Sequence, residues 1–402
     1  MKKKILIVSH FMNLGGVERS LLGLLDQFDY DQYDVSLFLF RHEGELMPYI
    51  PKQVHLLPEV KQYTALACPI KNVVKRGQLL LAGSRVYGKL KASFYDHRYQ
   101  SALESAVGIE YSHKYTKWLM PQITPDVTYD LAISFLTPHY FVAEKVHAKV
   151  KIAWIHTDYT KIMINRKSEL SMWSKYDHIA AISQSAADAF DQIFPQLKDK
   201  VTLIENILPK NLIQQQSNAF STSAEMPDDG NIKLLSVGRF SNAKNFDNVP
   251  EICSLLIQKG LHVKWYLIGY GADEGLIRSK IQQYHMEDKV ILLGKKDNPY
   301  PYMKACDLYI QPSRYEGKCV SVREAQMLCK PVVITKYPTS ASQLEDGVDG
   351  VIVPMDNTGC AEGIYSVLTN KELLETLRKN CADRDYSNAQ EITKVYSFIE
   401  DR

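Results

Sequence analysis

Short runs of apolar and β-branched residues alternate with amphipathic stretches along nearly the whole chain. Seven runs in the first half predict strands at 4–9, 34–40, 54–57, 129–136, 150–156, 178–183 and 201–206. Six more in the second half predict strands at 233–238, 263–269, 289–294, 308–313, 331–335 and 350–354. Continuous apolar strands separated by helical stretches are typical of parallel sheets covered on both faces. The pattern therefore predicts an α/β protein with two doubly wound, Rossmann-like domains.

A polar stretch, QQQSNAFSTSAEMPDDGN, separates the two sets of strands. It is rich in small residues and contains Pro227 and Gly230, which is typical of a linker. We expect an N-terminal domain at 1–213, a linker at 214–231 and a C-terminal domain at 232–385, with a helix at 386–402 packing back on the N-terminal domain. Because ligands of doubly wound sheets bind beyond the carboxyl ends of the strands, we expect the site in a cleft between the domains.

Composition narrows the class of protein. The 402 residues exceed what one core usually supports, and the formal net charge of +2 argues against a dedicated nucleic-acid binder. The seven cysteines form no C-x-x-C pair, which predicts reduced thiols and a cytoplasmic location. No apolar run reaches the roughly 18–20 residues of a membrane span. The start, MKKKILIVSH, has too short an apolar part for a secretory signal, so we expect it to form the first buried strand.

The loop after the first strand, SHFMNLGGVERSLLGLL, contains the pair Gly15 and Gly16. Glycines let a backbone approach a ligand closely, and the helix that begins near Val17 can turn its free N–H groups toward an anion. The alternative is that the pair only forms a tight turn between strand and helix. The G-x-G-x-x-G fingerprint of dinucleotide-binding proteins is absent.

The loop VGRFSNAKNF, after the first strand of the second half, carries Arg239 and Lys244. A guanidinium and an ammonium beside a helix start suit a diphosphate, because together they neutralise its charge. The alternative is a solvated basic turn.

The stretch SRYEGKCVSVREAQMLCKPVVIT places Glu316 on a loop and Glu324 near a helix start. Ser321 to Glu324 matches S-x-x-E, so Glu324 could simply belong to a capping box. Alternatively, the N–H groups at the helix start bind a phosphate, Glu324 accepts hydrogen bonds from an attached ribose, and Glu316 addresses hydroxyls beyond the diphosphate. Two acids around a phosphate-binding turn fit a sugar–diphosphate–nucleoside.

Taken together, these motifs resemble the retaining family 4 glycosyltransferases of GT-B fold, whose E-x7-E signature matches Glu316 and Glu324. The resemblance covers nearly the whole chain, because the glycine loop, SVGRF with Lys244, and framework segments such as LIGYG, ACDLYIQPS and DHIAAISQSAADAF follow in the family's order. The family commonly has an aromatic residue after the E-G step, where this chain has Lys318 and Cys319. The resemblance therefore leaves the donor sugar open.

The resemblance implies roles for these residues. Arg239 and Lys244 would hold the donor diphosphate and stabilise the leaving group, Glu324 would bind the ribose, and Glu316 would contact the donor sugar. The donor pocket would be completed by Gly15, Gly16, Gly317, Lys318, Cys319, Val320 and Ser321, with Lys296 as a further candidate. His156, in WIHTDY, would contact the donor sugar or the reacting centre, with Asp158 as a second candidate and a purely structural histidine as the alternative. No metal and no cofactor is expected, since the nucleotide sugar is the donor substrate.

Residues 61–120 contain ten Lys or Arg against three acids. Val73, Leu80, Tyr87 and Phe94 recur every seven residues, with Lys75, Arg85 and Lys89 on the opposite side of the expected helix. Such a basic amphipathic segment, residues 71–98, can lie on an anionic membrane. The alternative is a helix whose apolar stripe faces the core and whose basic face is solvated.

We therefore expect a retaining, metal-independent glycosyltransferase. It would move a sugar from a UDP-linked donor to a glycan or lipid-linked saccharide in bacterial capsule, exopolysaccharide or other surface-glycan synthesis, in the cytoplasm or on the inner face of the plasma membrane. One alternative is a GT-B nucleotide-sugar epimerase, which needs no acceptor. Another is a catalytically silent subunit that binds nucleotide sugar and regulates a partner.

Overall fold

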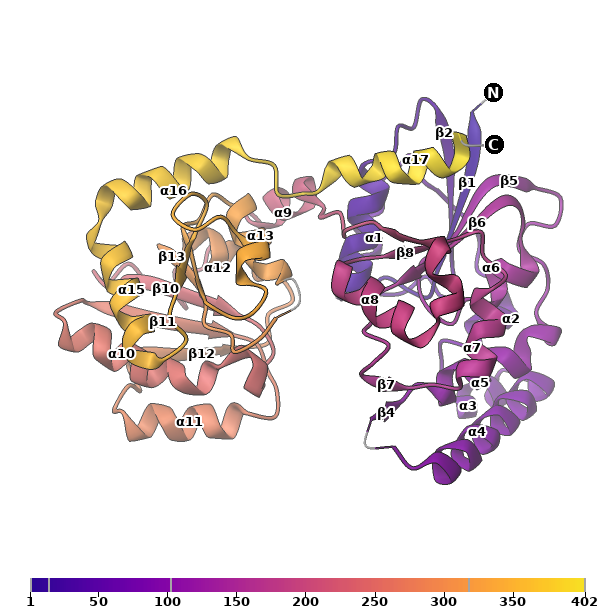
Figure 1. The fold of residues 1–402 in the computed structure, drawn as a ribbon, viewed down its shortest axis with the longest axis horizontal. Coiled ribbons are helices and arrows are strands. Elements are labelled where there is room, and N and C mark those ends of the chain that lie inside the picture. Colours follow the sequence, from indigo (N-terminus) through magenta and orange to yellow (C-terminus); the bar gives the residue numbers. More distant parts are fainter. Residues whose placement is uncertain (1, 14, 102, 317–318, 401–402) are drawn as a thin grey trace. The chain divides into compact units, whose positions relative to one another are not determined.

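The computed structural model describes residues 2–13, 15–101, 103–316 and 319–400 (Figure 1). The chain divides into two compact units. Unit 1 comprises residues 1–208 and 388–402, and unit 2 comprises residues 209–387. The chain thus enters unit 2 ahead of the predicted linker at 214–231, and that stretch belongs to unit 2, where Glu225 pairs with Lys296 at 2.6 Å.

Unit 1 is built on a seven-stranded sheet with the order β3-β2-β1-β5-β6-β8-β9. All neighbouring strands run parallel. The strands are β1 (Lys3–Ser9), β2 (Tyr33–Leu39), β3 (His55–Leu56), β5 (Thr128–Ser134), β6 (His147–Ile155), β8 (His178–Ala181) and β9 (Val201–Leu203). The seven predicted strands are confirmed. A separate two-stranded sheet, β4 (Glu104–Ser105) with β7 (Ile162–Met163), was not predicted, because two-residue strands leave no apolar run.

Helices surround this sheet. They are α1 (Gly16–Asp26), α2 (Lys61–Thr64), α3 (Ile70–Lys75), α4 (Leu79–Tyr99), α5 (Val107–Thr116), α6 (Tyr140–Lys145), α7 (Arg166–Trp173), α8 (Gln184–Ile193) and α17 (Ile392–Glu400). Short 3-10 turns include η1 (Met47–Tyr49), η2 (Lys117–Leu119), η3 (Pro195–Lys200) and η6 (Ala389–Glu391). Within the described part of the chain, none of the helices combines the length and apolar character needed to cross a bilayer.

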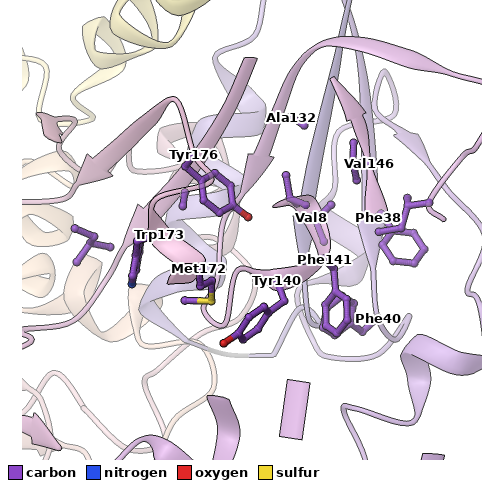
Figure 2. Close-up of a cluster of buried hydrophobic side chains, with 14 of the residues drawn as sticks. Val8, Phe38, Phe40, Ala132, Tyr140, Phe141, Val146, Met172, Trp173 and Tyr176 are labelled. Carbon is purple, nitrogen blue, oxygen red and sulfur yellow. The ribbon is translucent and has the colours of Figure 1, made fainter. Parts of the chain in front are cut away.

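The core of unit 1 is rich in aromatic side chains (Figure 2). Phe40 meets Phe141 of α6 edge to face, with ring centroids 5.6 Å apart. Trp173 of α7 meets Phe190 of α8 in the same way at 5.0 Å. Such pairs add about 0.5–1.5 kcal/mol to the burial of their area. The first pair fastens α6 to the end of β2, and the second fastens α7 to α8.

The last helix, α17, belongs to unit 1. Its Tyr396 stacks on Tyr33 at the start of β2, with centroids 4.4 Å apart, and its Phe398 lies 4.3 Å from the ring of His178. Lys394 donates to the carbonyl of Leu203 in β9. The end of the chain is thus fastened to both halves of the first sheet.

Unit 2 has a six-stranded parallel sheet with the order β12-β11-β10-β13-β14-β15. Its strands are β10 (Ile232–Val237), β11 (Val263–Ile268), β12 (Val290–Gly294), β13 (Leu308–Gln311), β14 (Val332–Thr335) and β15 (Val351–Val353). Its helices are α9 (Lys210–Gln216), α10 (Val249–Gln258), α11 (Glu274–Gln283), α12 (Tyr300–Ala305), α13 (Val320–Met327), α14 (Ser340–Gln343), α15 (Asn357–Thr369) and α16 (Lys371–Asp383), with 3-10 turns η4 (Asn242–Lys244) and η5 (Phe246–Asn248). The six predicted strands are confirmed.

The core of unit 2 surrounds Trp265 of β11, which is fully buried. Its indole N–H donates to Ser236 at 2.9 Å, and Ser236 donates to the carbonyl of Ile310. A buried polar group without a partner lowers the stability of the fold. These two hydrogen bonds give the buried polar atoms of β11, β10 and β13 their partners. They hold β10 and β13 in the register that positions the loops described next.

Candidate functional site

Two loops of unit 2 follow the neighbouring strands at which the strand order of its sheet reverses. β10 and β13 are parallel neighbours, yet β11 and β12 lie on one side of β10 and β14 and β15 on the far side of β13. The loop 238–248 follows β10, and the loop 312–319 follows β13. Such a switch point opens a crevice at the carboxyl ends of the strands, where ligands of these sheets bind.

Lys244 and Glu316 form an ion pair across these two loops. The Lys244 Nζ lies 2.6 Å from Glu316 Oε1, and the side chains are only 18% and 12% exposed. Ser313 donates to the same carboxylate oxygen at 2.6 Å and itself accepts from Gln311. The acid is thus held by a hydrogen-bonded chain that starts inside the sheet, which fixes its orientation.

Burial disfavours the Lys244 ammonium, but the neighbouring Cys319 sulfur and the Glu316 carboxylate favour it more. They raise the pKa of Lys244 above its usual value. An ammonium has three donors, and Glu316 and the Cys319 sulfur at 3.7 Å account for two among the described residues. Lys244 can therefore offer its remaining N–H and its permanent charge to an anion.

A second ion pair joins the same loops and was not predicted. Arg314 binds Asp247 through two parallel bonds of 2.9 and 2.7 Å, and its guanidinium also donates to the carbonyl of Asn242. Arg314 stands in the same stretch as Glu316, and Asp247 directly follows the loop VGRFSNAKNF. Their pairing could not be foreseen, because they lie 67 positions apart and only the sheet order brings them together.

The capping-box alternative for Ser321 and Glu324 is wrong. The helix α13 begins at Val320, its N-cap is Cys319, and no side chain caps it. Ser321 therefore lies inside the first turn, and its hydroxyl faces the carbonyl of Val237 at 3.4 Å. The N–H of Cys319 is taken by the amide of Gln343, at 2.7 Å.

Glu324 lies in α13, four residues after the helix begins, and is 3% exposed. Its carboxylate accepts a hydrogen bond from the hydroxyl of Tyr300 at 2.7 Å. Tyr300 begins α12, another segment that sequence spacing did not connect with the E-x7-E stretch. Glu324 is a buried, hydrogen-bonded acid beside the switch point.

The remaining predicted residues of unit 2 differ in their surroundings. Arg239 is exposed and has no ion pair or side-chain hydrogen bond with the described residues. Lys296 pairs with Glu225 and lies over the ring of Tyr302, so it contacts other parts of unit 2 than Lys244 and Glu316 do. Gly317 and Lys318 lie outside the described residues.

In unit 1, Gly15 and Gly16 stand at the start of α1, as the sequence predicted. Gly15 is the N-cap with an extended backbone, and a Cβ there would meet the Glu18 carboxylate at 2.1 Å. Glu18 therefore folds back over the first turn, where a negative charge is favourable. An anion-binding role for the glycine pair stays a prediction.

His156 and Asp158 follow β6. His156 is half-buried against Phe135, with ring centroids 4.8 Å apart, and burial lowers its pKa to about 4. Its Nε2 is buried and has no partner among the described residues. Asp158 accepts two bonds from Thr160, at 2.8 and 2.6 Å, which is the pattern of a local turn.

Three further histidines of unit 1 were not predicted as site residues. His10 follows β1, His139 follows β5 and His113 lies in α5, and all three are buried. Burial lowers the pKa of each, and each keeps one ring nitrogen without a partner among the described residues. Single histidines carry no spacing signal. The sheet order β1-β5-β6 groups His10 and His139 with His156, and the ring of His113 lies 5.5 Å from that of His10.

The basic segment at 71–98 differs from the single helix that was expected. It forms α3 and α4, separated by Gly77 at φ +73°. The stripe of Leu80, Tyr87 and Phe94 is exposed, at 77%, 49% and 68%, so the alternative of a core-facing stripe is wrong for α4. The helix packs instead through small residues such as Gly88, where a Cβ would meet the carbonyl of Tyr111 in α5 at 2.8 Å.

Two of the predicted residues in this segment are structural. Val73 is fully buried. Arg85 turns inward and donates to the carbonyls of Ala65 and Cys68 and to Ser112, and burial lowers its pKa. Lys75 and Lys89 are exposed, as the sequence predicted.

The comparisons with known proteins agree with the site in unit 2. Residues 220–384 match the family model of "Glycosyl transferases group 1", which includes both loops and both acids. A 153-residue part is 29% identical to "N-acetylgalactosamine-N,N'-diacetylbacillosaminyl-diphospho-undecaprenol 4-alpha-N-acetylgalactosaminyltransferase" of Campylobacter jejuni, covering 38% of this chain and 41% of that relative.

Solved structures match over the entire chain. Anabaena Alr3699/HepE in complex with UDP and glucose has a TM-score of 0.64 at 17% identity, with all of both chains covered. A variant of Staphylococcus aureus TarM in complex with Fondaparinux, alpha-GlcNAc-glycerol and UDP has a TM-score of 0.62 at 15% identity, with 99% of both chains covered. At these identities the likeness concerns the fold, and the protein has the predicted GT-B fold.

Proposed function

We propose that the protein is a retaining glycosyltransferase. It transfers a sugar from a UDP-linked donor to a glycan or lipid-linked saccharide in bacterial surface-glycan synthesis. The observation that carries this proposal is the Lys244–Glu316 pair at the switch point of unit 2, within the segment that matches the group 1 model. A cation that an acid orients in a partly buried loop is suited to a diphosphate leaving group.

Each residue has a part in the proposed reaction. Lys244 and Arg239 bind the diphosphate and stabilise the charge that develops on it as the glycosidic bond breaks. Glu316 orients Lys244 and accepts hydrogen bonds from hydroxyls of the donor sugar, and Glu324 accepts hydrogen bonds from the ribose. His156 is neutral at physiological pH and offers its unpartnered Nε2 to the donor sugar or to the attacking hydroxyl.

UDP as the nucleotide and a saccharide as the acceptor are supported by the similar proteins. The HepE structure holds UDP and glucose, and the Campylobacter relative's name specifies an acceptor linked to diphospho-undecaprenol. The exposed stripe of α4, with basic residues around it, supports peripheral binding to an anionic membrane, where such acceptors are found.

The decisive experiment pairs a donor screen with product analysis. Thermal unfolding with UDP, GDP, ADP and their glucose and N-acetylglucosamine sugars should show the largest stabilisation by the UDP series. Incubation of the best donor with candidate saccharides, followed by NMR of the new anomeric proton, should show the donor's configuration retained. A changed sugar without any acceptor would instead establish an epimerase. Binding without turnover on every acceptor would favour the silent subunit.

A further inference from the structure

A cationic pocket in unit 1 lies outside every site described above. Its volume is about 300 Å³, at the lower end of the about 300–1,000 Å³ of small-molecule sites. Four lysines from three elements line it: Lys114 from α5, Lys117 from η2, Lys167 from α7, and Lys175 just after α7. Hydroxyl and amide groups of α6 and α7 complete the wall. We call this cavity the lysine pocket.

The positive charge of the lysine pocket is not balanced. Lys117 and Lys175 both bind Oε1 of Glu144, each at 2.5 Å. Burial opposes the Glu144 charge, but these two hydrogen bonds outweigh it and lower the pKa of Glu144, so the carboxylate is ionised. A single carboxylate neutralises only one of the two ammonium groups.

The other two lysines form no ion pair with the described residues. Lys114 donates to the neutral hydroxyl of Ser168 at 2.6 Å. Lys167 is exposed and forms no ion pair or hydrogen bond with the described residues. Together the four lysines retain more positive charge than Glu144 can neutralise.

Two further acids, Glu110 and Glu169, stand behind the wall. Ser168 and Tyr140 both donate their hydroxyls to Glu110, whose pKa burial raises. In Figure 2 the hydroxyl of Tyr140 points away from the rings of Phe40 and Phe141. Even with Glu110 and Glu169 ionised, four cations face at most three carboxylates, so the pocket keeps a net positive charge.

We propose that the lysine pocket binds a phosphate or diphosphate group of the acceptor. Lysine ammonium groups are compact charges that bind phosphate oxygens in any orientation, and four of them around one cavity match a group with several anionic oxygens. The assignment to the acceptor rests on the proposed function, whereas the anion site rests on the pocket alone. The donor diphosphate has its own cations, Arg239 and Lys244, in unit 2.

The surroundings of the pocket fit an anion that is attached to an apolar chain. In η2, Lys117 lines the pocket, Trp118 is 78% exposed, and Leu119 lines a separate groove with Leu79 and Leu80. A three-residue turn therefore joins a cationic cavity to an apolar groove. A lipid-borne phosphate could occupy both, whereas a soluble phosphosaccharide would occupy only the first.

The test is a titration of the full chain with inorganic pyrophosphate by calorimetry. It is done in an Arg239→Ala, Lys244→Ala background, so that neither cation of the donor loop contributes. Lys167→Glu should weaken pyrophosphate binding at least tenfold, because the exposed lysine can be reversed without breaking a structural contact. Lys52→Glu, an equal charge change at an exposed lysine of unit 1 outside the pocket, should leave it unchanged. Equal affinities in the two variants, or no binding at all, would overturn the proposal.

A second variant and a second ligand complete the test. Lys114→Gln should also weaken pyrophosphate binding, and thermal unfolding checks that the variant is folded. If Lys167→Glu also loses binding to vesicles with phosphatidic acid, and pyrophosphate competes with them, the ligand is lipid-borne. If only pyrophosphate binding falls, the ligand is soluble. UDP binding, measured on the same pocket variants with Arg239 and Lys244 intact, should not change, and its absence in the wild type would count against the proposed function rather than against the pocket.

Discussion

The carboxyl edges of the two sheets differ in the charge of the polar side chains that they carry. In unit 2 the edge carries charges that are paired: Lys244 with Glu316, and Arg314 with Asp247. In unit 1 the edge carries histidines that burial keeps neutral, among them His10 and His156, each with an unpartnered ring nitrogen. The same architecture thus presents fixed charge on one sheet and neutral hydrogen-bonding groups on the other.

This difference corresponds to two kinds of ligand. Fixed charges stabilise a diphosphate, whose charge is permanent, and neutral imidazoles suit uncharged hydroxyls. The family model likewise matches only one of the two edges: it covers residues 220–384, which include the charged edge and none of the unit 1 edge. The charged edge consists of two loops that can be recognised by their sequence, whereas the neutral edge consists of single residues from separate segments.

The largest expected effect on UDP binding is at the charged edge. Lys244→Ala should weaken UDP binding by roughly 1.5–3 kcal/mol, because a charge-assisted bond is lost. It also leaves Glu316 without its cation. Breaking a fully buried pair costs about 3–5 kcal/mol, and the partial exposure of this pair reduces the expected loss of stability to about 1–3 kcal/mol.

The matched control is Arg239→Ala. Arg239 is exposed, so its removal should weaken UDP binding to a similar extent while the free energy of unfolding stays unchanged. Calorimetry with UDP and urea unfolding measure the two quantities. Unchanged UDP affinity in both folded variants would remove the proposed phosphate site.

The next effect tests the neutral character of unit 1. Glu169 is 3% exposed, and burial, with Glu110 nearby, raises its pKa to about 8. Between its usual value of 4.5 and 8 the folded state holds a proton that the unfolded state has released. The stability from Glu169 is therefore complete below pH 4.5 and is lost as the pH rises toward 8.

Glu169→Gln carries no such proton. It should be more stable than the wild type by on the order of 3 kcal/mol at pH 7 and by less than about 1 kcal/mol at pH 5. Hydrogen exchange at both pH values should place the gain in β5 of unit 1 and not in β10 of unit 2. A gain independent of pH would mean that Glu169 is already ionised in the folded protein.

A third prediction contrasts the exposed surfaces of the units. Large exposed hydrophobic residues concentrate on unit 1, from Val74 to Leu119. Changing Lys75, Lys89 and Lys91 together to Glu should reduce binding to anionic vesicles by about 2–3 kcal/mol at low salt, at about 1 kcal/mol per charge. UDP affinity should stay unchanged, because the donor loops belong to unit 2. Co-sedimentation with phosphatidylglycerol vesicles measures the effect.

Arg85 is left out of this set because its guanidinium holds the loop at Ala65 and Cys68. Equal sedimentation of wild type and triple variant, or equal binding to neutral and anionic vesicles, would leave the stripe as a surface for another partner.

The smallest effect on stability is expected at Glu324. Glu324→Gln keeps an acceptor for Tyr300, so the free energy of unfolding should change by less than about 1 kcal/mol while UDP affinity falls. Tyr300→Phe is the converse: it should cost about 1 kcal/mol of stability and leave UDP affinity nearly unchanged. If Glu324→Gln instead lost stability and kept UDP affinity, the acid would be purely structural.

The apolar pattern alone predicted the strands of both sheets, because a strand covered on both faces must be a continuous apolar run. Sequence patterns failed where the role of a single residue depends on its three-dimensional surroundings. The S-x-x-E spacing offered a capping box as an alternative for Glu324, but the helix begins two residues too early for Ser321 to cap it. Inward-facing Arg85 was counted as a surface charge, since a sequence does not record which basic residue finds carbonyls to bind.

The sequence by itself determined the two parallel-sheet units, the loops that follow β10 and β13, and the acid and cation types that those loops carry. Only the tertiary structure decided that Lys244 meets Glu316, that Arg314 holds Asp247, and that four lysines surround one cavity. The physical reason is range. Hydrophobic periodicity is a local property of the chain, whereas these pairings join residues brought together by the order of strands and the packing of helices, which no spacing along the chain encodes.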